Sequence, residues 1–510
     1  MTTLRVRTQM GSWLVFSVLA CVASRQARAE TPDRSDPFRA AAVGGIETAF
    51  FQNGEPLDLA AFGLGTLGAA VRPGSRADIR LGYESFGSTN EMAQQNSYWN
   101  GTAFVPFQQI STFTERRTSI GSAPAMGYYA FNNLSSVSDL PGQPAIVDAR
   151  WNDGGASSYA LRVGGSTKSE TYENQTQYSA DAPPYYTAND LTSTYRWNAV
   201  WPRFSYTYRG TDLMQGFAVD AYLQDSPVPT VGGFRQLSAA YGLGGTAGGV
   251  QIGGQLRGRA WTMSHPIASA TSRTLVDPSV TLAVAIPGSH VQFGFGTSLD
   301  SITETGRFPF VITSSSLRAK FRAADADHWG FAGGMKADLH TLSAGAGGRY
   351  VSASARGGAG FEGPGGSLGI EARALERGLN GYEYFDVSDG FHFGTGNTDY
   401  RPVSEVALGG EIAVIEGLRL RGGLVRRMIP TRIVSMSATD QWETRSGTGF
   451  TGGASWENGN VRVAFDASYM KQTVLSGGLY YYSEIHAYPG SVETQSQSEL
   501  VAHLGTTFFW

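Results

Sequence analysis

The sequence contains very little cysteine, few charged residues and no long hydrophobic run. Cys21 is the only cysteine among 510 residues, which excludes a disulfide framework and a thiolate metal site. Only 16% of the residues are charged, against roughly 25% in soluble domains. The mean hydropathy of −0.19 excludes a helical membrane protein that crosses the bilayer many times.

Glycine and aromatic residues are abundant instead. The chain contains 66 glycines, and 12% of its residues are aromatic, which excludes a disordered tail and a collagen-like rod. The length is compatible either with several soluble domains or with one large closed sheet.

Residues 1–29 have the pattern of a secretory signal peptide. Arg5 and Arg7 precede an apolar stretch over 13–23, and Ala27-Arg28-Ala29 forms a small-x-small cleavage site. An alternative is a lipoprotein box over 18–21, in which Cys21 becomes the lipidated first residue. Either reading predicts export from the cytoplasm.

Beyond residue 75 the chain repeatedly alternates apolar and polar residues over about ten positions, the pattern of strands with two different faces. In 461–469, for example, Val461, Val463 and Phe465 share one face, and Arg462 and Asp466 share the other. Tight turn signals such as Glu457-Asn458-Gly459-Asn460 join these runs in pairs. Longer polar segments separate the pairs, at 166–198, 377–403, 429–445 and 474–497. Alternation of short turns and long loops is typical of outer-membrane barrels.

The C-terminus ends on Phe508-Phe509-Trp510. The alternation places Phe508 and Trp510 on the apolar face, where an aromatic girdle would contact the membrane boundary. This ending resembles the C-terminal aromatic signature of Gram-negative outer-membrane proteins. The resemblance implies location in the cell outer membrane, with outer-membrane lipid and the barrel-assembly machinery as partners.

The predicted fold is therefore all-β: a transmembrane antiparallel barrel of roughly 16 to 18 strands, with short periplasmic turns and long extracellular loops. The alternative is a secreted array of soluble β-sandwiches, whose strands also alternate. The predicted organisation is a signal peptide over 1–29, an N-terminal luminal or plug segment over 30–75 and the barrel over 76–510.

The N-terminal part of the mature chain distantly resembles the long-chain fatty-acid transporter family. The resemblance rests on a Gly- and Ala-rich stretch over 63–70 that is followed by an early strand over 76–86. It implies a segment folded into the lumen as a hatch. The Asn-Pro-Ala element of that family is absent from this sequence.

If the apolar positions contact lipid, their neighbours face the lumen. On this basis arginine and lysine outnumber the inward acids, which are Asp78, Glu84, Glu371, Glu411 and Asp466. The candidate solute-binding residues are Arg257, Arg259, Arg318, Lys320, Arg322, Arg419, Arg421 and Arg462. Like charges two residues apart on one face, about 7 Å, repel by roughly 0.6 kcal/mol in water and about 2.4 kcal/mol at an effective dielectric of 20. The interior should therefore be wet, or acids or passing anions should balance these cations.

Two interpretations of these cations remain open. They either form an electropositive constriction for anionic solutes, or they brace the wall as a ladder with the inward acids and the plug. A similar choice applies to the aromatic residues of loop 377–403 and to Tyr480-Tyr481-Tyr482, which either capture a ligand or anchor the outer rim.

The sequence gives no support for catalysis, a metal or a cofactor. Gly63-x-Gly65-x-x-Gly68 and Gly365-x-Ser367-x-Gly369 match nucleotide-binding and nucleophile-elbow motifs only in letters, since neither precedes a predicted helix. His340 and Ser343 fall on opposite faces of a strand.

The predicted function is passive passage of small, anionic solutes through an outer-membrane channel or transporter, without contact with nucleic acid. The alternatives are a transporter of hydrophobic substrates such as fatty acids, and a non-conducting scaffold or adhesion barrel.

Overall fold

The structure is a computed structural model. The residues that it describes are 43, 46, 48–51, 57–67, 76–99, 104–120, 147–178, 191–224, 234–263, 273–304, 310–325, 327–344, 348–375, 382–386, 390–394, 403–433, 441–479, 482–483, 486–487 and 491–510. None of the helices in this described part is long and apolar enough to cross a membrane.

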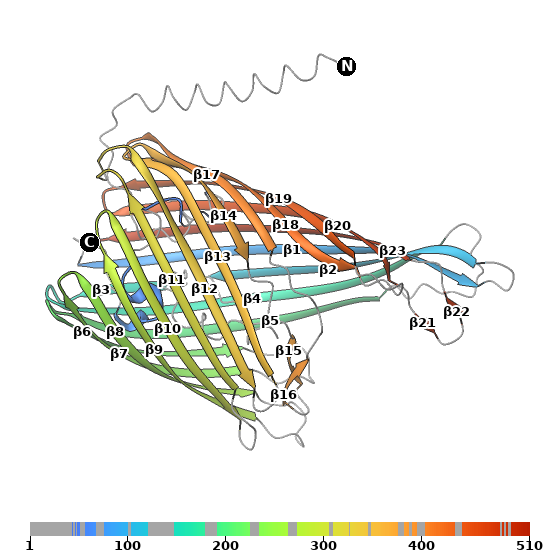
Figure 1. The fold of residues 1–510 in the computed structure, drawn as a ribbon, viewed down its shortest axis with the longest axis horizontal. Coiled ribbons are helices and arrows are strands. Elements are labelled where there is room, and N and C mark those ends of the chain that lie inside the picture. The colour runs from blue at the N-terminus through green and yellow to red at the C-terminus, as the bar shows by residue number, and fades with distance from the viewer. Residues whose placement is uncertain are drawn as a thin grey trace, which may run out of the picture.

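Nineteen strands form one sheet (Figure 1). The first nine are β1 (Ala77–Trp99), β2 (Phe104–Ile120), β3 (Val147–Asn152), β4 (Ser157–Tyr178), β5 (Leu191–Arg209), β6 (Leu213–Gln224), β7 (Phe234–Ala247), β8 (Val250–Met263) and β9 (Arg273–Pro287). The other ten are β10 (Val291–Glu304), β11 (Phe310–Arg322), β12 (Gly330–Ala344), β13 (Gly348–Gly363), β14 (Gly366–Leu375), β17 (Val403–Ile415), β18 (Leu418–Ile433), β19 (Gln441–Asn458), β20 (Val461–Leu479) and β23 (Ser491–Phe509).

Two small hairpins complete the described strands. They are β15 (Tyr382–Asp386) with β16 (Gly390–Gly394), and β21 (Tyr482–Ser483) with β22 (His486–Ala487). The side chains of the two aromatic clusters expected in these regions lie outside the described residues.

The sheet closes on itself because β1 pairs with β23, from Asp78 opposite Phe509 to Gln94 opposite Glu493. On its other side β1 pairs with β3 near one end and with β2 further along, and both are antiparallel to β1 and to β4. On β4, Val163 pairs with β3 and Gly165 pairs with β2, so only Gly164 separates the two pairings. β2 and β3 therefore occupy one strand position, and the barrel has 18 positions, as predicted.

Short turns gather at one end of the barrel. Gly417 and Gly459 adopt φ of 76° and 57° in two of these turns, a conformation that favours glycine. The C-terminus lies at the same end (Figure 1), which is the periplasmic end in outer-membrane barrels. The turn between β7 and β8 falls at Gly248-Gly249.

An apolar belt covers the outside of the barrel. On β23 and at the C-terminus, Leu500, Leu504, Phe508 and Trp510 are exposed, whereas Phe509 faces inward and is buried. From Leu500 to Trp510, ten steps of about 3.3 Å at a tilt of about 40° give a belt roughly 25 Å tall. This height matches the hydrocarbon region that an outer-membrane barrel spans.

Aromatic side chains mark the periplasmic edge of the belt. The ring centroids of Trp151 and Tyr159 lie 5.5 Å apart, and Tyr159 is 5.2 Å from Tyr206. Tyr206 is in turn 5.6 Å from Phe217 on the next strand. Rows of this kind are the aromatic girdles that lie at a membrane–water interface.

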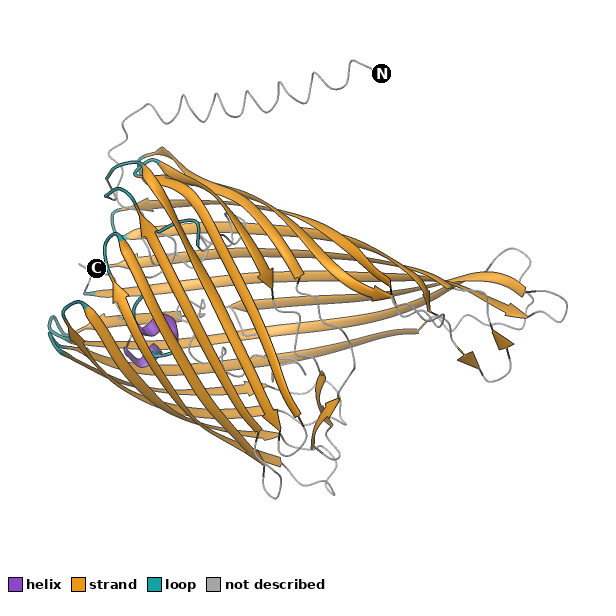
Figure 2. Cartoon of the chain, in the orientation of Figure 1, coloured by secondary structure: helices purple, strands orange, loops and turns teal. Residues whose placement is uncertain are grey.

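Several strands continue far beyond the belt, so most of the long loops predicted from the sequence are shorter than expected. β4 and β5 extend into the predicted loop 166–198, β18 and β19 into 429–445, and β20 and β23 into 474–497. Outside the membrane both faces of a strand meet water, so the apolar–polar alternation that reveals a strand is lost. Figure 2 shows the extended strands projecting from the end opposite the C-terminus.

An N-terminal stretch lies inside the barrel (Figure 2). We call residues 43–67 the luminal segment; among them the structure describes 43, 46, 48–51 and 57–67. It contains the short 3-10 helices η1 (Leu59–Phe62) and η2 (Gly65–Leu67). The boundaries 1–29, 30–75 and 76–510 stay predictions, since residues 1–42 and 68–75 are not described.

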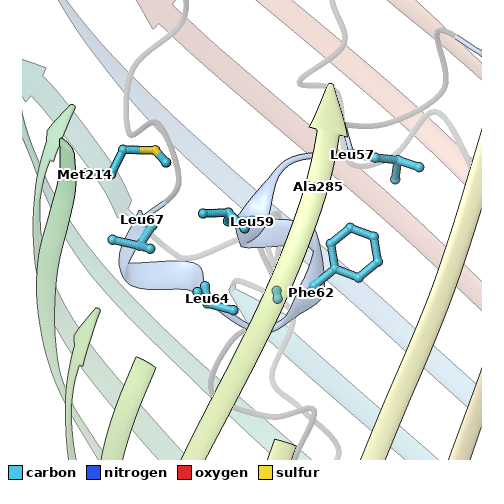
Figure 3. Close-up of a cluster of buried hydrophobic side chains, with 8 residues drawn as sticks. Leu57, Leu59, Phe62, Leu64, Leu67, Met214 and Ala285 are labelled. Carbon is cyan, nitrogen blue, oxygen red and sulfur yellow. The ribbon is translucent and has the colours of Figure 1, made fainter. Parts of the chain in front are cut away.

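The luminal segment packs on the wall in two buried clusters. In the first, Leu59, Leu64 and Leu67 pack with Met214 and Ala285 (Figure 3). The second is formed on the other part of the wall by Val43, Ile46, Ala49, Phe50, Ala407 and Val425. Burial of these apolar side chains holds the segment against the inner face.

Strand glycines create the space for this packing. A Cβ built at Gly242 would overlap Oγ1 of Thr66, and one at Gly369 would lie 2.7 Å from the Phe50 ring and 2.9 Å from the Ala49 Cβ. The high glycine content therefore follows in part from the close approach of the luminal segment to the wall.

We expect Gly242→Ala to destabilise the barrel by about 1–3 kcal/mol, since the added methyl group overpacks the contact with Thr66. Gly258→Ala is the matched control, because no atom lies within 4 Å of a Cβ at that position. Urea unfolding followed by heat-modifiable gel mobility measures both variants. Equal stability of the two variants would contradict the packing described.

Candidate functional site: the charged lumen

Hydrogen-bonded register brings charges of opposite sign together on the inner wall. One row runs through neighbouring strands β4, β5 and β6, and its members are Arg162, Arg203 and Asp220. Because side chains of paired residues on one face lie about 5 Å apart, such a row is a continuous band of ionic groups.

Two of the candidate solute-binding arginines lie on β8 and pair with two aspartates. Arg259 Nε lies 2.8 Å from Asp277 Oδ2, and Arg257 Nη2 lies 2.9 Å from Asp300 Oδ1. Arg259 Nη2 also approaches Asp300 at 3.4 Å. All four side chains are at most 4% exposed. Acids therefore balance the like charges at 257 and 259.

A similar cluster links β17, β18 and β20. Glu411 accepts hydrogen bonds from Arg419 Nη1 at 2.9 Å and from Arg421 Nε at 2.8 Å. Arg421 also reaches Asp466 Oδ1 at 3.5 Å and donates to Ser455 Oγ at 2.9 Å. The remaining predicted cation of this region, Arg462, pairs with Glu457.

The three predicted cations of β11 lie beside the luminal segment. The Arg318 guanidinium is 5.4 Å from the Phe62 ring centroid, and that of Arg322 is 5.0 Å from the Phe51 ring centroid. Lys320, between them, is buried. Part of the positive charge expected in the pore therefore contacts the luminal segment through cation–π interactions.

A second row on the wall consists mainly of cations. Its members lie on adjacent strands β11, β12, β13, β14, β17 and β18, and are Arg318, Lys336, Arg356, Arg373, Glu405 and Arg427. We call the five cations of this row the basic row. The side chains of Lys336, Arg356 and Arg427 are 20%, 21% and 26% exposed, so solvent reaches them.

Three carboxylates partly balance the basic row. Glu371 lies 2.7 Å from Arg373 Nε and 4.0 Å from Arg356 Nη1. Asp338 lies 3.3 Å from Lys336 Nζ, and Glu405 lies 2.8 Å from Arg427 Nε. Within the described part of the chain, these three carboxylates pair with four of the five cations of the row.

Polar contacts anchor the luminal segment at several points. Thr48 donates from both its backbone N and its Oγ1 to Glu371, at 2.6 and 2.7 Å. Thr66 does the same to Gln255 Oε1, at 3.2 and 2.7 Å. Arg209 binds Asp58 Oδ2 and the Leu67 carbonyl, both at 3.0 Å.

The sequence-predicted site residues do not form one constriction. They lie in three groups on different strands. The first group is on β8, the second is on β18 and β20, and the third is on β11. Inward acids that the sequence analysis missed include Asp277, Asp300, Asp338 and Glu405. Glu405 has the same two-residue phase as Glu411 and was detectable. Asp277 could not be detected in this way, because Pro278 follows it directly and proline is unusual inside a strand.

Three members of the basic row, Lys336, Arg356 and Arg427, were also missed. Ser352, Ser354 and Arg356 alternate with Val351, Ala353 and Ala355, so periodicity could have placed Arg356 inward. The described residues contain no group of three or more His, Cys, Asp or Glu side chains that could hold a metal ion.

Comparison with known proteins gives no family and no curated relative: no family model matches, and no curated protein sequence matches. Among solved structures, a BenF-like porin from Pseudomonas fluorescens Pf-5 is 9% identical, with a TM-score of 0.36, 86% of this chain covered and 99% of that chain. A Pseudomonas aeruginosa FadL homologue is 10% identical, with a TM-score of 0.35 and coverages of 94% and 98%. The P. putida toluene transporter TodX is 9% identical, with a TM-score of 0.32 and coverages of 94% and 99%. At these values neither a family nor a substrate follows.

The closed antiparallel sheet, the outward apolar belt and the charged lumen together define the class of protein. The chain is a transmembrane β-barrel of the Gram-negative outer-membrane type.

We expect Asp277→Asn to lower the free energy of unfolding by about 3 kcal/mol, because the buried Arg259 loses its nearest carboxylate and retains the longer 3.4 Å contact with Asp300. Asp325→Asn is the control. Asp325 pairs with His290 at 3.2 Å on the surface, where the two side chains are 71% and 49% exposed, and its loss should cost at most about 1 kcal/mol. Urea titration of both variants distinguishes a buried structural pair from a dispensable one.

Proposed function

We propose that this barrel is an outer-membrane channel or transporter for small anionic solutes. The observation that supports the proposal best is the basic row, in which five cations on adjacent strands face the lumen and three of them are solvent-accessible. Rings of arginine and lysine favour anions in selective pores.

The height of the basic row supports a role in capture. Lys336 and Arg356 lie two residues further from the periplasmic turns than Gly334 and Gly358, and those two glycines approach Thr48 and Ala49 of the luminal segment. On this part of the wall, a solute that enters from outside would meet Lys336 and Arg356 before it meets Thr48 and Ala49.

Partial neutralisation of the row is compatible with transport. Conduction requires an attraction strong enough for entry and weak enough for release. Asp338, Glu371 and Glu405 reduce the positive potential without cancelling it. The row would then concentrate anions in the lumen without trapping them.

We further propose that the luminal segment acts as a plug that narrows the passage. Its apolar side chains are fully buried against the wall, and its polar anchors lie on β5, β8 and β14. Because those apolar side chains are covered, the described residues of the segment offer no open apolar pocket, which disfavours the fatty-acid alternative.

One observation favours a second candidate function. The strands that project beyond the belt are longer than a channel needs, since β1 continues from Gly87, which pairs with Leu500, to Trp99, about 40 Å at about 3.3 Å per residue. A scaffold or adhesion barrel would use such a projection to bind a partner outside the cell. Absence of conductance in the recordings described next would favour this candidate.

We expect the double variant Lys336→Gln/Arg356→Gln to lose anion preference in planar-bilayer recordings. Each cation attracts an anion about 7 Å away by roughly 0.6 kcal/mol in water and repels a cation equally, so the anion/cation permeability ratio should fall by at least roughly sevenfold. The outward-facing Arg235→Gln is the control and should leave the ratio unchanged. An unchanged ratio in the double variant would remove the basic row from the mechanism.

Arg209→Ala should raise single-channel conductance, because it removes both the Asp58 ion pair and the bond to the Leu67 carbonyl that hold the luminal segment to β5. Limited proteolysis of the folded barrel reports whether the segment has become accessible. Greater accessibility with unchanged conductance would show that the segment does not restrict the passage.

A further inference from the structure

Two cations interrupt the outward apolar face on the two strands that flank β19. Arg426 on β18 and Lys471 on β20 are both exposed and share the outward phase of Leu424 and Tyr469. A cation within the hydrocarbon costs about 2–4 kcal/mol at the midplane and close to zero at the interface. Their positions therefore require an explanation.

Register places the two cations on either side of one hydroxyl. Thr448 on β19 pairs with Arg426 on one side and with Lys471 on the other. Arg426 Nη1 donates to Thr448 Oγ1 at 2.6 Å. With strands about 4.8 Å apart, the Cα atoms of the two cations are separated by about 10 Å, a distance that both long side chains can bridge toward a common ligand.

The surroundings of the pair are apolar on the periplasmic side, whereas on the extracellular side Ser446 lies beside Met428, which is 38% exposed. Directly below lie Leu424, Phe450 and Tyr469, which are 43%, 59% and 41% exposed. Ser446 is the next outward residue above Thr448. The cations therefore lie close to the extracellular edge of the belt, where long basic side chains extend toward headgroups.

No described carboxylate neutralises the pair. The flanking outward residues in the same row are Val406 on β17 and Ser498 on β23, and among the described residues neither cation forms an ion pair with a carboxylate. Two like charges at this spacing favour an anion between them, and phosphate is the anion that arginine and lysine bind in common.

We propose that Arg426, Thr448 and Lys471 form a binding site for the phosphate groups of a phosphorylated glycolipid in the outer leaflet. The phosphate is bound between the two cations, with the Thr448 hydroxyl at its base. The acyl chains lie along the apolar row formed by Leu424, Phe450 and Tyr469. The site thus fixes one lipid molecule on the wall formed by β18, β19 and β20.

Arg235 provides an internal comparison. It is exposed on the outward face of β7, on another part of the wall, and its cross-strand neighbours are Leu223 and Thr262. A single cation of this kind can reach the interface but does not form a paired site.

The test is native mass spectrometry of the full-length barrel in detergent, titrated with bisphosphorylated lipid A and with the same lipid after removal of its phosphates. Each cation near an anionic surface contributes about 1 kcal/mol, so Arg426→Gln or Lys471→Gln should weaken binding about fivefold and the double variant roughly 30-fold. Arg235→Gln should bind like the unmodified protein. Heat-modifiable gel mobility confirms that each variant is folded.

Three outcomes would overturn the proposal. They are equal binding of the phosphorylated and dephosphorylated lipid, an unchanged affinity in the folded double variant, and a loss in Arg235→Gln as large as the loss in the double variant. Competition with millimolar inorganic phosphate separates the two sources of the anion. Full displacement would identify a site for free phosphate and refute a lipid site, whereas retention of the lipid supports the proposal.

Discussion

Pairing between β1 and β23 closes the sheet, and this closure is the constraint on which the rest of the structure depends. A closed barrel satisfies all the backbone hydrogen bonds of the spanning strands without an open edge, as hydrocarbon surroundings require. Closure also gives every strand an inside and an outside. Each two-residue step along a strand then assigns one side chain to lipid and the next to the lumen.

The charged lumen follows from this assignment. Charges that face inward meet one another across neighbouring strands, and they are stable there only when opposite signs are matched. Arg259 with Asp277, and Arg421 with Glu411, satisfy this condition in deeply buried positions. The basic row is the part of the wall where cations lie side by side on adjacent strands and solvent reaches them, which is why the proposed transport function rests on it.

The luminal segment imposes a second requirement on the same wall. Its side chains approach the strands so closely that an added Cβ at Gly242 or Gly369 would overlap them. Acids and amides that face the segment, including Glu371 and Gln255, act as its hydrogen-bond acceptors. The wall residues therefore serve two partners, the segment and the neighbouring strands, and Glu371 contacts both.

Alternation, turn signals and the C-terminal aromatic residues determined the fold class, because lipid and lumen differ sharply in polarity along each strand within the belt. The same reasoning placed Phe508 and Trp510 outward and predicted 16 to 18 strands. It failed for the strand extensions beyond the belt, where water on both faces erases the pattern. Only the tertiary structure decided which charges meet, since partners such as Arg257 and Asp300 come from different strands and their register depends on how the whole sheet closes.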